Sequence, residues 1–141
     1  MISHDTKYFQ SKYNALAGSD YGETVGAVWR IYNDIRRRTN RKPYVRSRYF
    51  KKSKVFIDSF WQHLNQKSHS DRVRRLKYFA CGIDLLRNSC QIPESRPNPN
   101  GRNEIVHRFA GKTKNGQIFY VQVRESRRGD RYLMSVFPDT K

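Results

Sequence analysis

The sequence predicts an α+β protein in which helices come first and an antiparallel β-sheet follows. Three runs rich in β-branched and aromatic residues lie between Glu104 and Pro138 and are separated by polar, glycine-containing breaks, a pattern typical of a three-stranded meander. Before them, apolar residues recur at helical spacing. A segment rich in proline and asparagine, residues 89–103, separates the two patterns. We therefore predict a basic helical region over residues 1–70 and a helix plus antiparallel sheet over residues 71–141.

Four helices are expected before the sheet. Asp20 and Glu23 have the spacing of a capping box, which predicts the start of the best-marked helix. That helix should end near Thr39, because Lys42-Pro43 follows. Ser70 is a good N-cap for the last one. The expected ranges are residues 1–19, 20–39 and 53–66, with the fourth helix running from Ser70 to Asn88.

The charge of the chain indicates its class of partner. Lys and Arg number 29 against 12 Asp and Glu, a formal net charge of +17. Such a charge attracts polyanions, so nucleic acid is the first candidate partner and an anionic membrane surface the second. No run of 18 apolar residues predicts a membrane span, and the N-terminal residues lack the apolar core of a signal peptide. Two cysteines make no disulfide framework and no metal motif, so we expect a cytoplasmic protein without a cofactor or a metal.

The most one-sided charge cluster lies between Arg36 and Lys54. This segment holds ten basic residues and no acidic one, with Tyr44, Tyr49 and Phe50 interleaved. Basic groups neutralise phosphates and aromatic rings stack on bases, which favours contact with RNA or DNA over a merely solvated loop anchored by its rings. The residues expected to contact nucleic acid here are Arg46, Arg48, Lys51 and Lys52.

The second strand of the meander is expected to have one apolar and one polar face. Phe119, Val121 and Val123 alternate with three polar residues, and a strand sends alternate side chains to opposite faces. The apolar set should pack on a helix. The polar set could hold a phosphodiester, although for this strand alone an ordinary solvent face with cross-strand pairs is the favoured interpretation. The polar set is Tyr120, Gln122 and Arg124.

The other two strands supply further candidates. His107 shares its side of the strand with Ile105 and Phe109, a position where histidine is more often a core residue than a catalyst. If exposed, its pKa suits proton transfer near neutrality. Arg108 should point to the opposite side. Ser135, a polar residue in an apolar run, could bind a phosphate or could fit tight packing.

The break between the first two strands reads G-K-T-K-N-G. Its glycines would let backbone amides approach an anion beside Lys112, Thr113 and Lys114, but K-N-G is also a common hairpin turn. The spacing differs from the phosphate loop of nucleotide hydrolases, so nucleotide hydrolysis is rejected.

The segment H-R-F-A-G-K-T…G-Q-I-F-Y-V-Q-V-R-E…R-Y-L-M-S-V-F-P, with L-K-Y-F-A-C-G-I-D-L-L-R-N-S before it, resembles phage-type nucleases of the barnase, EndoU, colicin and RelE-like (BECR) superfamily. The resemblance covers residues 72–138. It implies a helix-plus-antiparallel-sheet fold and metal-independent cleavage of RNA, often tRNA or ribosome-bound mRNA and often as a toxin. An acidic antitoxin or immunity protein would then be a partner.

The resemblance also implies roles for matching residues. In a transesterification by the ribose 2′-OH, His107 would act as base or acid, Lys112 and Arg124 would hold the phosphate, and Ser135 would orient it. The alternative is a non-catalytic basic module that binds RNA or DNA, which would tolerate His107→Ala. The remaining residues expected to bind substrate are Arg108, Thr113, Lys114, Tyr120, Gln122 and Arg131.

Overall fold

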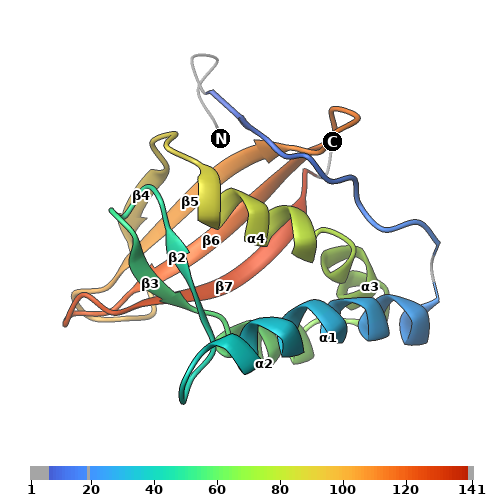
Figure 1. Ribbon diagram of the computed structural model, residues 1–141. Helices are drawn as coiled ribbons and strands as arrows, with labels where there is room; N and C mark the ends of the chain where they lie inside the picture. Colours follow the sequence, from blue (N-terminus) through green and yellow to red (C-terminus); the bar gives the residue numbers. More distant parts are fainter. Residues whose placement is uncertain (1–6, 19, 140–141) are drawn as a thin grey trace.

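The computed structural model describes residues 7–18 and 20–139 and confirms an α+β fold with one curled sheet (Figure 1). Within these residues the strand order is β1-β5-β6-β7-β3-β2, and β4 pairs with β5. None of the helices there has the length and apolar character that a membrane span requires. The elements are β1 (Phe9–Gln10), α1 (Tyr21–Arg38), β2 (Tyr44–Ser47), β3 (Ser53–Phe56), α2 (Ser59–Asn65), α3 (His69–Leu76), α4 (Phe79–Asn88), β4 (Glu94–Pro97), β5 (Ile105–Lys112), β6 (Ile118–Glu125) and β7 (Arg131–Pro138).

The meander of β5, β6 and β7 is antiparallel, as expected. Phe119, Val121 and Val123 are fully buried, which confirms the predicted apolar face of β6. Helix α4 packs against this face, which we call the inner face of the sheet (Figure 1). The contact is close because Gly82 has no side chain: a Cβ there would lie 2.7 Å from Cγ2 of Val136.

Helix α1 begins and ends where the sequence predicts. The side chain of Asp20 accepts a hydrogen bond from the backbone N–H of Glu23 at 2.8 Å, which satisfies one of the free donors of the first turn. The helix ends at Arg38, with Thr39 in extended conformation as its C-cap. Its buried side, with Val28, Tyr32 and Ile35, joins the common core.

The helix predicted over residues 53–66 is wrong at its start. Residues 53–56 form β3, which pairs antiparallel with β2 and parallel with β7, and only α2 over Ser59–Asn65 is helical. The reason is tertiary: Val55 is fully buried between two neighbouring strands, and this pairing overrides the local helical pattern. The basic segment over 36–54 therefore runs from the end of α1 into a β-hairpin that is attached to the sheet.

Three other local predictions also need correction. The helix expected over residues 1–19 is wrong for its described part, where β1 pairs parallel with β5; residues 1–6 and 19 lie outside the described residues. The single helix from Ser70 is two helices, α3 and α4, and the N-cap is Ser68, whose hydroxyl accepts from the N–H of Asp71. The proline-rich loop contains β4.

The hairpin of β2 and β3 folds back over the inner face. The rings of Tyr49 and Phe50 both pack edge-on against Phe109 of β5. Because β3 pairs with β7 and β1 with β5, strands from residues 1–70 and from residues 71–141 belong to one sheet. The two regions share one hydrophobic cluster.

Candidate nucleic-acid interface

The side of the meander opposite α4 gathers several of the predicted site residues. Arg108, Gln122 and Ser135 are register partners across β5, β6 and β7, so they form one row on the same face. Tyr120 and Phe137 form the next row. We call this side the outer face and define it by Arg108, Tyr120, Gln122, Arg124, Tyr132, Ser135 and Phe137.

Arg108 lies at the centre of the outer face. Its guanidinium lies 5.8 Å from the ring centre of Tyr120 and 5.7 Å from that of Phe137. The amide oxygen of Gln122, in the orientation that satisfies both groups, accepts from Nη2 of Arg108 at 3.0 Å. Among the described residues no carboxylate forms an ion pair with Arg108. The side chain is thus held by rings and an amide, and its charge remains available to an anion.

Tyr120 can serve as a hydrogen-bond donor beside Arg108. Burial raises the pKa of the Tyr120 phenol, and the nearby carboxylate of Asp139 raises it further. The phenol therefore stays protonated at neutral pH. Its ring also packs against Phe137 at 5.5 Å between centroids, which leaves an aromatic surface next to a cation.

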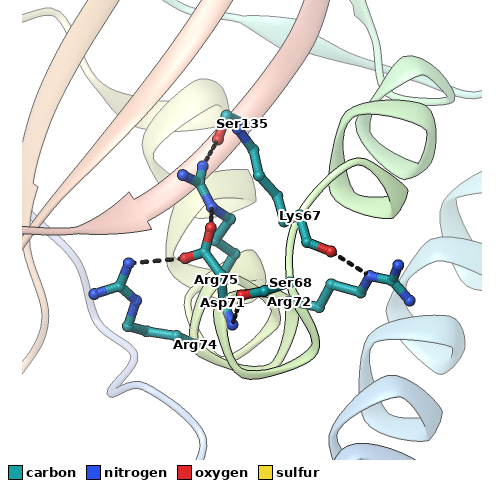
Figure 2. A network of polar contacts seen from close by, with 7 residues as sticks. All are labelled: Lys67, Ser68, Asp71, Arg72, Arg74, Arg75 and Ser135. Atoms are coloured by element: carbon teal, nitrogen blue, oxygen red, sulfur yellow. Dashed lines mark hydrogen bonds and ion pairs between the residues drawn. The ribbon is translucent and has the colours of Figure 1, made fainter.

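A second arginine reaches the outer face from helix α3 (Figure 2). Nη1 of Arg75 donates a short hydrogen bond to Oγ of Ser135, and the guanidinium lies 5.1 Å from the ring centre of Phe137. Asp71 orients it by accepting from Nε at 3.1 Å and also accepts from Nη2 of Arg74 at 2.8 Å. Burial raises the pKa of Asp71, but the hydrogen bonds from both arginines outweigh it and hold that pKa below its usual value.

The third cation, Arg124, is partly neutralised. Its Nη1 donates to Oε2 of Glu104 at 2.9 Å, and its guanidinium lies 4.6 Å from the ring centre of Tyr132. His63 of α2 lies close enough for this charge to act on it: burial lowers the pKa of His63, and Arg124 and then Lys67 lower it further. The half-buried imidazole is therefore neutral at pH 7.

A hollow of about 260 Å³ adjoins the outer face beside β4. Met134, the additional residue of a β-bulge in β7, contributes to its wall. The hollow places a carboxylate, that of Glu94, and a second guanidinium, that of Arg96, beside Arg108. The other lining residues are Pro97, Pro99, Val106 and Gln122.

His107 does not lie with these residues. It points to the inner face, is 8% exposed and packs its ring 5.1 Å from that of Phe50. Its Nδ1 is 2.6 Å from Oγ of Ser95, and its Nε2 is 3.0 Å from Oε1 of Glu125. Arg131 donates to the same carboxylate at 3.1 Å. The structure thus separates His107 and Arg131 from Arg124 and Ser135 by the thickness of the sheet.

The turn between β5 and β6 is a closed hairpin. Thr113 is fully buried, and its hydroxyl donates to Oδ1 of Asn115 at 2.6 Å and accepts from the N–H of Gln117 at 3.0 Å. Nζ of Lys112 lies 5.1 Å from the ring centre of Tyr8, and Lys114 is exposed at the tip. Thr113 therefore has a structural role. The turn follows the last residue of β5, whereas Val106, which pairs with Arg124 of β6, lies near the first residue of β5.

Sequence reasoning did not predict Arg75, Tyr132 and Phe137 as site residues, nor His63. For Arg75 the spacing of Asp71, Arg74 and Arg75 at i, i+3 and i+4 signals an oriented group. No pattern in the sequence around His63 indicates a functional role, because its neighbours in space depend on how α2 packs against the sheet. Among the described residues no cluster of His, Cys, Asp or Glu could hold a metal ion.

Comparisons of the chain with protein-family models, curated proteins and solved structures find no match. The functional assignment therefore depends on the geometry described above and on the resemblance of residues 72–138 noted from the sequence.

Proposed function

We propose that this chain binds RNA through the outer face of its sheet. The observation that carries the proposal is Arg108, held between Tyr120 and Phe137 without an ion-pair partner among the described residues. Cations that neutralise phosphates next to rings that stack on bases are the features with which proteins bind single strands. Arg75 adds a second oriented cation in the adjacent position.

Two further features support this proposal. The net charge of +17 favours association with any polyanion. The resemblance to nucleases of the barnase and RelE type favours RNA over DNA, and we extend the proposal to the fold: helices α3 and α4 followed by β5, β6 and β7 would correspond to the helix and antiparallel sheet of that superfamily.

Fluorescence anisotropy with a labelled single-stranded RNA tests the binding proposal. Arg108→Gln should make the slope of log K against log salt less negative by about 0.7, the value for one phosphate contact on a single strand. Arg30→Gln removes the same charge from an exposed position on α1 and is the matched control. Equal slopes for the two variants would refute a specific role for the outer face.

The second candidate is metal-independent cleavage of RNA on the same face. The feature that favours it is a half-buried imidazole, His63, whose pKa is lowered by burial and by the positive charge of Arg124. In this reaction the ribose 2′-oxygen attacks the adjacent phosphorus, the bond from phosphorus to the 5′-oxygen breaks, and a 2′,3′-cyclic phosphate forms. His63 would accept the proton of the 2′-OH, water would give a proton to the leaving 5′-oxygen, and Arg108 and Arg124 would stabilise the charge on the phosphoryl oxygens.

Incubation of total RNA with the purified protein in EDTA tests cleavage. Wild-type protein should release fragments with cyclic phosphate ends, and both His63→Gln and Arg124→Ala should lose this activity while the fold is kept. His69→Gln, an exposed histidine at the start of α3, is the control. Intact RNA after incubation with the wild type would leave RNA binding as the function.

A further inference from the structure

A second basic surface lies on the helical side of the molecule, away from the outer face. A pocket of about 780 Å³ opens between the end of α1, the hairpin of β2 and β3, and the end of α4. Its lining holds five cationic side chains and no carboxylate. The cationic residues are Arg38, Arg46, Arg48, Lys52 and Arg87, and the others are Ile35, Thr39, Tyr44, Val45 and Asn88.

Two cations of this basic pocket, Arg46 and Arg48, donate to backbone oxygens. Nη1 of Arg46 donates to the carbonyl of Lys52 at 3.0 Å, and Nη1 of Arg48 donates to the carbonyl of Asn88 at 3.5 Å. These bonds orient the guanidinium groups without neutralising them. In the described part of the chain, Arg38 is the pocket cation with an ion pair, a solvent-exposed one with Asp34 at 3.3 Å.

One cation of the pocket, Lys52, lies at a position with a left-handed backbone conformation, as do Lys51 and Arg41, which lie outside the pocket. Lys51 and Lys52 have φ values of 56° and 66°, and Arg41 has 63°. Each non-glycine residue in this left-handed region costs about 1–2 kcal/mol relative to right-handed geometry. Glycine would fit the position of Lys52 better, yet this position carries a cation that lines the pocket. Strain of this kind is characteristic of functional sites.

We propose that the basic pocket binds the phosphodiester backbone of nucleic acid as a second contact for the RNA held by the outer face. This inference rests on the proposed function. Guanidinium groups present planar pairs of N–H donors that match phosphate oxygens, and they converge here from three elements of the fold. A concave site with several such groups suits tetrahedral phosphates along a strand better than the carboxylates of a flat acidic protein surface.

The two surfaces belong to opposite sides of the sheet. The pocket includes Arg87 of α4, the helix that packs on the inner face, whereas Arg108 lies on the outer face. A strand must pass around an edge of the molecule to occupy both. Long single strands should therefore bind more tightly than short ones, and only the long ones should respond to changes at both surfaces.

Two double variants with equal loss of charge test the pocket. Lys52→Gly with Arg87→Gln removes two pocket cations, and Arg127→Gln with Arg128→Gln removes two exposed cations of the turn between β6 and β7 that do not line the pocket. Residue 52 has a positive φ, so glycine there introduces no backbone strain. Circular dichroism and thermal unfolding verify that both variants fold.

The measurement is anisotropy with a long single-stranded RNA across a salt series. Loss of two phosphate contacts should make the slope of log K against log salt less negative by about 1.4 and weaken binding about 25-fold at 0.1 M salt. The Arg127/Arg128 variant should keep a slope near that of the wild type.

The outcomes separate this inference from the function on which it rests. A wild-type protein that binds no RNA overturns both. If Arg108→Gln weakens RNA binding but the two double variants bind RNA equally strongly, the proposal for the pocket alone is overturned. An acidic protein would then be the partner to test for this surface.

Discussion

Asp84, a buried acidic residue of α4, attaches the N-terminal segment to the core. The loss of unfolding free energy on its removal can be worked out from its hydrogen bonds. Asp84 of α4 is 5% exposed and accepts hydrogen bonds from Oγ of Ser11 at 2.8 Å, from the N–H of Lys12 at 3.1 Å and from Nδ2 of Asn88 at 2.8 Å. A hydrogen bond to a charged group contributes about 1.5–3 kcal/mol. In Asp84→Ala, water can reach Lys12 and Asn88, which are exposed, but not the buried hydroxyl of Ser11.

The expected loss of unfolding free energy therefore comes mainly from the hydrogen bond with Ser11 and amounts to about 2–3 kcal/mol. For a domain of this size it corresponds to a fall in melting temperature of about 8 °C. Urea unfolding of Asp84→Ala, Ser11→Ala and the double variant measures the coupling between the two side chains, which should be about 1–2 kcal/mol. Additive effects of the two substitutions, or a loss below about 0.5 kcal/mol for Asp84→Ala, would refute the reasoning.

Three further predictions concern other parts of the fold. Burial raises the pKa of the Cys81 thiol to about 11, so a thiol reagent at pH 8 should label only Cys90 in the native protein and both cysteines in urea. The pKa of Asp71 is lower in the folded than in the unfolded state. Its contribution to stability is therefore fully present above the unfolded pKa of 3.8 and is lost as the pH falls through the folded pKa. Acid unfolding of Asp71→Asn should accordingly show a weaker pH dependence below about pH 4. Gly82→Ala should lower stability by about 1–3 kcal/mol in urea unfolding, because its Cβ would overlap Val136; an unchanged midpoint would show that α4 can shift.

Features that depend on neighbouring residues in the chain could be predicted from the sequence. The cap of α1 joins Asp20 to Glu23, three positions away, and the burial of Phe119, Val121 and Val123 follows from the alternation of a strand. The same alternation predicts that His107 and Arg108 point to opposite sides. These local rules hold because backbone geometry sets them.

The two helices that were predicted where the structure has strands failed because of pairing with other segments. Residues 53–56 carry a helical pattern but become β3, because β2 and β7 flank them. For the same reason β1, which pairs with β5 about a hundred positions later, was expected as a helix. Local propensity amounts to tenths of a kcal/mol per residue, and burial of a strand between two neighbours exceeds it.

For the candidate site, the sequence by itself determined the chemical character of the surface: an excess of arginine and lysine with interleaved rings, and a polar face on β6. Tertiary structure alone decided which of these groups meet. It brought Arg75 from helix α3 to the outer face and buried His107 between Ser95 and Glu125 on the other side. The physical reason is that a β-sheet separates its two faces completely, and only the packing of helices around its edges determines which side chains from elsewhere reach each face.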